Sequence, residues 1–146
     1  MGSRRQAREW ALSALYAREF NPGDPEETLS IFPLGRRGSA QSADYARELL
    51  QGVLHNLEYL DGLIGKCARN WDLKRITRID RNILRLALFE LCFRPDVPPL
   101  ACINEAVDLA KKFSTGKSGA FVNGILDEIR KNLAEKKNPE SGEALP

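Results

Sequence analysis

Long apolar stretches are absent from this chain of 146 residues. No run approaches the roughly 18 apolar residues that a helix needs to cross a bilayer, so we expect no membrane-spanning helix. The first five residues read MGSRR, and no apolar block of signal-peptide length follows them. This pattern argues against secretion, and we therefore expect a cytoplasmic protein.

Residues suited to catalysis or metal binding are also few. The three cysteines, Cys67, Cys92 and Cys102, form no C-x-x-C pair, which disfavours a disulfide framework and a zinc ribbon. His55 is the only histidine, and it lies just beside an apolar stripe, as a surface or boundary residue does. No serine or cysteine stands in a nucleophile signature, and no glycine-rich phosphate loop is present. We therefore expect neither an enzyme nor a bound metal or cofactor.

The composition is that of one globular domain. Apolar residues make up 42% of the chain and charged residues 29%, a balance that is typical of neither disordered nor membrane proteins. Lysine and arginine number 22 against 20 acidic residues, so the formal net charge is only +2. The total charge therefore indicates no class of partner, and the placement of the charges along the chain carries the information.

Apolar residues recur at helical spacing along most of the chain. The pattern predicts a helix over residues 4–20, then a short helix from Asp24 to Pro33 and a loop rich in Gly, Arg and Ser over 34–41. Further helices are predicted over 42–71, with a bend near Gly62 and Gly65, and over 76–93, 98–113 and 118–133.

The 76–93 segment is apolar around most of its circumference, which predicts a central helix. No segment shows the alternation of a β-strand, so the sequence predicts an all-α single domain of six to seven helices over residues 1–135. Residues 136–146 carry no apolar stripe and are predicted to be a disordered tail.

Arginine gathers in two places. One lies between positions 66 and 94, a segment that contains eight basic and three acidic residues. At its centre, Arg78, Arg81 and Arg85 share one face of the predicted helix. The other lies within two turns of the chain start and consists of Arg4, Arg5 and Arg8. Guanidinium groups bind phosphate through two parallel hydrogen bonds, so both groups are candidate RNA-binding residues. Two alternatives stay open, a solvated charged face and internal ion pairs with acids such as Asp80 and Glu90.

Flat side chains and a helix N-terminus add to this pattern. Tyr16 lies on the first predicted helix and Phe121 opens the last one, and both are candidates for stacking on single-stranded RNA, although an aromatic residue at helical spacing belongs to the core more often than to a stacking surface. Residues 114–118 read STGKS, and place hydroxyls, Lys117 and free backbone N–H groups before a helix that Ser118 can cap. This turn is a candidate phosphate site, whereas its spacing excludes a Walker loop.

Eight short strings of residues along the chain, taken in order, are typical of a known protein family. They are ARE at 7–9, ALY at 14–16, YLD at 59–61, DRNILRLA at 80–87, FEL at 89–91, DVP at 96–98, INEAVDLAK at 103–111 and FVNGILD at 121–127. In this order they resemble the NusB family of bacterial transcription antitermination factors. The resemblance covers the chain from about Arg4 to Leu133, and the INEA and FVNGILD strings are its most specific parts.

The resemblance implies a fold of two small helical bundles packed together. It also implies a function, because NusB proteins pair with the small-subunit ribosomal protein NusE, bind the boxA element of nascent RNA and help RNA polymerase read through terminators, notably on ribosomal RNA operons. In the family an arginine-rich N-terminus contributes to the RNA surface. The positions that match family residues on the RNA side are Arg4, Arg5, Arg8, Tyr16 and Phe121. Asp80 matches an acidic position on the side where NusE is expected.

Other interpretations stay open from the residues alone. A module that binds only proteins would use its arginines on acidic partner surfaces, and its binding would depend little on salt, whereas RNA binding depends on it steeply. A regulatory subunit of an enzyme would need a small-molecule pocket that the sequence does not indicate. The apolar residues of the 76–93 helix suit NusE and a second copy of the chain equally well, so monomer and homodimer both remain. The role of the 34–41 loop is also open.

Overall fold

The computed structural model describes residues 2–23, 40–68 and 76–137, and these residues form six helices and no strand. The helices are α1 (Gly2–Phe20), α4 (Ala40–His55), α5 (Leu57–Cys67), α6 (Arg78–Phe93), α7 (Pro99–Phe113) and α8 (Ser118–Lys137). The prediction of an all-α fold is confirmed. Over these ranges, the helices are all too short or too polar to span a bilayer.

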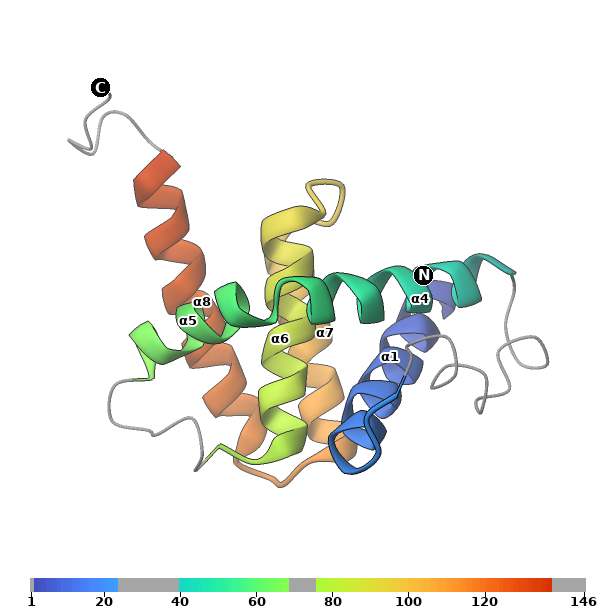
Figure 1. Cartoon of the computed structure of the whole chain (residues 1–146). Helices are drawn as coiled ribbons and strands as arrows, with labels where there is room; N and C mark the ends of the chain where they lie inside the picture. The colour runs from blue at the N-terminus through green and yellow to red at the C-terminus, as the bar shows by residue number, and fades with distance from the viewer. Residues whose placement is uncertain (1, 24–39, 69–75, 138–146) are drawn as a thin grey trace.

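Helix α6 lies at the centre and contacts each of the other five described helices (Figure 1). Ile83, Leu84 and Leu88 are completely buried on it, as the apolar residues around most of its circumference predict. The helix begins after Thr77, whose side-chain oxygen accepts a hydrogen bond from the backbone N–H of Asp80 at 3.1 Å. This N-cap fixes where the central helix starts.

The other helices form two groups that share α6. Helix α1 packs against α4 on one side, while α7 packs against α8 on the other and α5 contacts both α6 and α8 (Figure 1). Buried apolar side chains from all six helices join in one continuous core. The arrangement is that of two small bundles packed together, as the resemblance implies.

Helix α4 crosses α6 very closely at Gly52. A Cβ atom at this position would lie 2.2 Å from Cε1 of Phe89 and 2.3 Å from its Cζ, so the ring occupies the space that any side chain would need. Phe89 is buried and stacks on Phe93, with ring centroids 5.5 Å apart. The absence of a side chain at Gly52 therefore allows the two helices to approach.

Some boundaries differ from those predicted. The 42–71 segment is broken at Asn56, whose Nδ2 donates to the carbonyl of Gly52 at 2.8 Å, while Gly62 and Gly65 lie within a continuous α5. Helix α8 continues to Lys137, which is two residues into the predicted tail. Residues 40 and 41 of the predicted loop belong to α4. The predicted 24–33 helix, the rest of that loop and residues 138–146 lie outside the described residues.

Candidate functional site

Exposed ion pairs bridge the first turns of α1 and the facing side of α7. The Arg5 side chain is 58% exposed, and its Nη2 donates to Glu105 Oε2 at 2.8 Å and lies 3.5 Å from Asp108 Oδ2. One turn further along α1, Glu9 accepts a hydrogen bond from Lys112 Nζ at 2.9 Å. These side chains line a shallow hollow of about 160 Å³. At this end, α1 and α7 are therefore joined by charged groups that solvent can reach.

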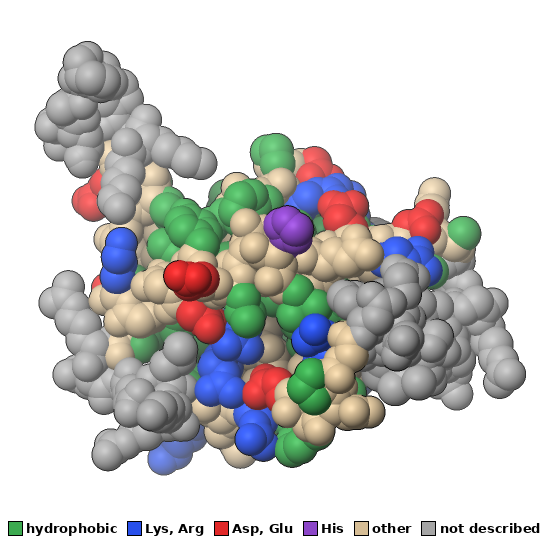
Figure 2. Space-filling view, in the orientation of Figure 1, with side chains coloured by type: hydrophobic (Ala, Val, Ile, Leu, Met, Phe, Trp, Pro, Cys, Tyr) green, Lys and Arg blue, Asp and Glu red, His purple; other side chains and the backbone are tan. Residues whose placement is uncertain are grey.

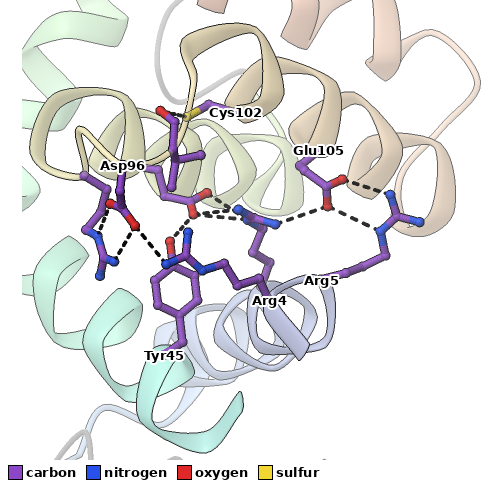
Figure 3. A network of polar contacts seen from close by, with 10 residues as sticks. Arg4, Arg5, Tyr45, Asp96, Cys102 and Glu105 are labelled. Carbon is purple, nitrogen blue, oxygen red and sulfur yellow. Dashed lines mark hydrogen bonds and ion pairs between the residues drawn. The ribbon is translucent and has the colours of Figure 1, made fainter. Parts of the chain in front are cut away.

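Arg8 lies one turn inward from Arg5 and is buried, with 7% of its surface exposed. Its Nε and Nη2 donate to the two carboxylate oxygens of Glu90, each at 2.9 Å, and its Nη1 donates to Glu105 at 3.3 Å. Glu90 is only 2% exposed and also accepts a hydrogen bond from the hydroxyl of Tyr45. The network, seen from close by in Figure 3, joins side chains of α1, α4, α6 and α7.

Guanidinium groups surround the ring of Tyr45. Those of Arg4 and Arg94 lie 4.7 Å and 5.0 Å from the ring centroid, and both donate to Asp96 in the turn before α7 (Figure 3). Burial of Tyr45 and its hydrogen bond to Glu90 raise the pKa of the phenol far above its ordinary value. The hydrogen bonds from Arg94 and Arg4 hold the pKa of the Asp96 carboxyl far below its usual range.

The second arginine group, which consists of Arg78, Arg81 and Arg85 on α6, faces the C-terminal end of α1. Nη2 of Arg81 donates to Glu19 Oε1 at 2.9 Å, Nε of Arg78 lies 3.4 Å from the same oxygen, and Arg85 donates twice to Asp61, at 2.7 Å and 2.8 Å. Three guanidinium groups therefore share two carboxylates. The Arg78 side chain is 52% exposed and that of Arg85 only 12%. Figure 2 shows basic side chains gathered over the lower part of α6 with acidic side chains beside them.

The two arginine groups lie at opposite ends of α1. Arg8 and Glu19, the acid that holds the second group, are eleven residues apart, which is about 16 Å along a helix. Each of the six arginines has a carboxylate partner. Internal ion pairs are therefore present, with Glu19 and Asp61 as acids that the sequence did not single out, and the arginines do not form one row of unpaired guanidinium groups.

The turn before α8 is held by a buried carboxylate. Oγ of Ser114 donates to Asp80 Oδ1 at 2.7 Å, and Oγ of Ser118 donates to Asp80 Oδ2 at 2.8 Å. Asp80 is 6% exposed and Ser118 is 4% exposed. The Ser118 hydroxyl was predicted to meet a phosphate, but in the structure it donates to a carboxylate, so Thr115 and Lys117 are the exposed polar side chains of this turn that remain.

Lys117 and Phe121 lie at the edge of a larger hollow between the starts of α6 and α8, of about 490 Å³, which we call the α6–α8 hollow. Ile76, Thr77 and Asp80 line its other side. Phe121 is half-buried and packs partly against the core, while Lys117 is exposed. The hollow thus brings together three residues predicted to bind RNA, Lys117, Ser118 and Phe121, and the one predicted to meet a protein partner, Asp80.

Tyr16 lies at the surface of α1 near the second arginine group. Its ring meets that of Phe20 edge-on, with centroids 5.1 Å apart, and the guanidinium of Arg78 lies 4.7 Å from the Phe20 centroid. Both aromatic residues are exposed, so the core position that the sequence left open is excluded for Tyr16.

Histidine and cysteine are few among the described residues. His55 lies at the surface, as its place beside the apolar stripe predicts. The cysteines are free thiols, with Cys102 buried and Cys67 and Cys92 half-buried. In residues 2–23, 40–68 and 76–137, no three His, Cys, Asp or Glu side chains gather in a way that could hold a metal ion.

The sequence singled out the arginines and, of the groups that hold them, named only Glu90 as a possible ion-pair partner. Glu90, Glu105 and Tyr45 were not predicted as site residues, because their partners lie far away in the chain. Glu90 belongs to the FEL string and Glu105 to the INEA string, so two strings that carry the family resemblance supply the acids that bind Arg8. The strings that carry the family resemblance therefore already contained the two acids of this network.

Comparison with known proteins identifies the family. The model of the NusB family matches residues 5–131. The chain belongs to the NusB family. A transcription antitermination protein NusB of Geobacter sulfurreducens is 42% identical over 137 residues, which cover 93% of this chain and 99% of that protein.

Solved NusB structures share the fold. A structure of T. maritima NusB matches with a TM-score of 0.83 and 38% identity, over 97% of both chains. A chain from a crystal structure of the antitermination factors NusB and NusE in complex with dsRNA matches with a TM-score of 0.81 and 30% identity, over 90% of this chain and 98% of that one. The described helices are therefore those of a NusB fold.

Proposed function

We propose that this chain is a transcription antitermination factor that binds boxA RNA together with NusE. The pair would join the antitermination complex of RNA polymerase and promote read-through, notably on ribosomal RNA operons. The observation that carries the proposal is the match, over 90% of the chain, to a NusB structure in complex with NusE and RNA. Relatives that are named transcription antitermination proteins and cover nearly the whole chain support it.

The RNA-binding surface in this proposal starts at the exposed N-terminal arginines. Arg5 and Arg4 are held by carboxylates at the surface, and exposed ion pairs of this kind are worth only about 0–1 kcal/mol. An RNA phosphate can therefore take the place of Glu105 or Asp108 at little cost. Lys112, which pairs with Glu9 across the same hollow, adds a further cation to this face.

Lys117 and Phe121 extend the proposed surface. Among the described residues, no ion pair holds Lys117, so its ammonium group is available to a phosphate. Phe121 lies beside it and lines the α6–α8 hollow, and it is the aromatic residue proposed to stack on a base there. Phosphate contacts would supply affinity that falls with salt, and stacking with base-edge contacts would supply sequence preference.

The second arginine group contributes mainly charge. Arg78 is the most exposed of the three and lies over the ring of Phe20, which in turn meets that of Tyr16, so it is the member proposed to contact RNA directly. Arg81 and Arg85 lie deeper in their ion pairs. With three guanidinium groups on two carboxylates, the group adds a local positive potential that attracts RNA.

NusE is proposed to bind at the start of α6. Asp80 lines the α6–α8 hollow from the opposite side to Lys117 and Phe121, which supports a protein partner whose surface continues that of the RNA. Because Asp80 is buried and holds Ser114 and Ser118, its part is to shape the wall of the hollow. Two partners that share one RNA then raise each other's apparent affinity.

The oligomeric state belongs to the same proposal. Tyr59, Phe93 and Leu100 are large apolar residues that are 43–62% exposed around the end of α6 and the start of α7. Apolar surface of this kind suits NusE or a second copy of the chain. Size-exclusion chromatography with light scattering, with and without NusE and a boxA oligonucleotide, measures which of them is bound.

A filter-binding titration tests the proposed function. The double variant Arg5→Glu/Lys117→Glu should lose about tenfold or more in affinity for boxA RNA in the presence of NusE, and keep its helical content. Its plot of log affinity against log salt should be shallower by about 1.4, as expected for two lost phosphate contacts. The control Lys66→Glu, exposed on α5, should bind like the wild type. Unchanged affinity in the double variant, or binding that salt leaves unchanged, would contradict the proposal.

A further inference from the structure

Arg8 differs from the arginines that surround it. It is the one buried arginine among the described residues, and its Nε, Nη1 and Nη2 all donate to carboxylates inside the protein. The neighbouring Arg5 lies on the same side of α1, one turn earlier, with most of its side chain in solvent. A guanidinium that binds phosphate needs donors that face the solvent, and those of Arg8 face Glu90 and Glu105.

A direct contact between Arg8 and RNA would require its pair with Glu90 to open. Glu90 is 2% exposed, and without Arg8 the hydroxyl of Tyr45 would be its one remaining side-chain donor in the network. An uncompensated carboxylate in the interior is strongly destabilising, so the pair stays closed when RNA binds.

We propose that Arg8 is a positioning residue for RNA binding. Its buried pair with Glu90 fixes the first two turns of α1 on α6, so that Arg5 and Arg4, rather than Arg8 itself, meet the RNA. The inference rests on the proposed function. The pair also neutralises Glu90, whose charge would otherwise draw the guanidinium groups of Arg4 and Arg5 inward, since Arg4 already lies over the ring of Tyr45.

Two variants separate positioning from contact. Arg8→Met removes the guanidinium and leaves Glu90 charged, whereas Arg8→Met/Glu90→Leu/Tyr45→Phe replaces the whole buried polar group with apolar side chains of similar size. Such replacements often keep or raise stability. The single variant should melt at a lower temperature and bind boxA RNA with NusE about tenfold more weakly, while the triple variant should regain an affinity within about threefold of the wild type.

A second measurement uses the wild-type protein and so does not depend on the folding of a variant. In the ¹⁵N spectrum of the wild type, the Nε–H signal of Arg5 should move when NusE and boxA RNA are added. That of Arg8 should keep its position and its slow exchange with water, because its hydrogen bond to Glu90 persists. This measurement decides alone if the triple variant does not fold.

Different results overturn the two proposals. A wild-type chain that fails to bind boxA RNA with NusE refutes the proposed function, and the inference about Arg8 with it. If the wild type binds, a folded triple variant as weak as Arg8→Met refutes only the positioning role. An Arg8 Nε–H signal that moves as far as that of Arg5 does the same, because both results require the guanidinium itself to touch the RNA.

Discussion

The thiol of Cys102 donates a hydrogen bond to the carbonyl of Val97, with 3.9 Å between the sulfur and the oxygen. The contact lies where the turn after α6 enters α7, next to the network of Figure 3, and both residues are buried. Its surroundings leave the sulfur neutral: burial first, and then the negative charge of Glu90, raise the pKa of the Cys102 thiol to about 12. The thiol therefore behaves as part of the core.

This environment predicts how the three cysteines react. At about pH 8 a thiol with a pKa near 12 is ionised in about one molecule in ten thousand, so Cys102 should stay unmodified by iodoacetamide in the folded protein. Cys67 and Cys92 are half-buried and should be modified first. Peptide mass spectrometry at timed intervals gives the order, and all three should react in denaturant. Early modification of Cys102 would contradict the placement of its side chain.

The carboxylate of Asp80 should be important for stability as well as for partner binding. Asp80→Ala leaves the hydroxyls of Ser114 and Ser118 without their buried acceptor, so we expect a loss of about 2–3 kcal/mol in the free energy of unfolding. Urea unfolding measures this loss. A matched control is Asp108→Ala, whose carboxylate lies in an exposed ion pair and should contribute about 1 kcal/mol or less. Equal losses in both variants would show that the turn is not held by Asp80.

Glu105 should make the stability depend on pH. The hydrogen bond from Arg5 and the charge of Arg8 hold the pKa of Glu105 below its ordinary value of 4.5, against the opposing effect of burial. A carboxyl whose pKa is lower in the folded than in the unfolded state makes its full contribution to the free energy of unfolding above its ordinary pKa. This contribution is lost as the pH falls through the lowered pKa. The wild type should therefore exceed Glu105→Gln in unfolding free energy by a constant amount near neutral pH, and by less and less below pH 4.5.

Urea titrations at a series of pH values measure that difference. The same comparison in an Arg5→Gln background should give a smaller difference, because the main cause of the lowered pKa is then absent. If the difference in unfolding free energy between the wild type and Glu105→Gln grows on acidification, its pH dependence has the wrong sign, and the role of the Arg5–Glu105 pair is refuted.

Apolar periodicity predicted most of the fold. It predicted the central position of α6 and the C-terminal end of α1, which begins two residues earlier than predicted, because core-facing residues recur every three or four positions regardless of what they contact. The break at Asn56 was missed, since the glycines at 62 and 65 looked like better sites for a bend. At the break, the side-chain amide of Asn56 donates a hydrogen bond to the carbonyl of Gly52. The spacing of apolar residues does not show a hydrogen bond of this kind.

The charged groups were harder to predict than the helices. Spacing within one helix showed that the arginines cluster, but Arg8 and Glu90 are 82 residues apart and Arg81 and Glu19 are 62 apart. Pairing over such distances depends on how helices pack, which local patterns do not contain. The sequence therefore located the basic groups correctly and did not show that carboxylates occupy them.

The crossing of α4 and α6 provides the last prediction. In a helix interior, Gly→Ala normally stabilises by about 0.5–1 kcal/mol, because alanine loses less backbone entropy on folding. At Gly52 a methyl group would overlap the Phe89 ring, so the ring or the helices must move, at a cost of about 1–3 kcal/mol. We expect Gly52→Ala to be destabilising, and Gly52→Ala/Phe89→Leu to recover part of the loss by removing the ring.

Gly62 offers the matched control on α5, because an added Cβ there would meet nothing within 4 Å. Gly62→Ala should raise the melting temperature while Gly52→Ala lowers it, although both substitutions have the same intrinsic effect on a helix. Thermal unfolding of the two single variants isolates the contribution of the crossing. Two variants of equal stability would mean that the Phe89 ring can move aside freely, and the close approach of α4 to α6 would then not constrain position 52.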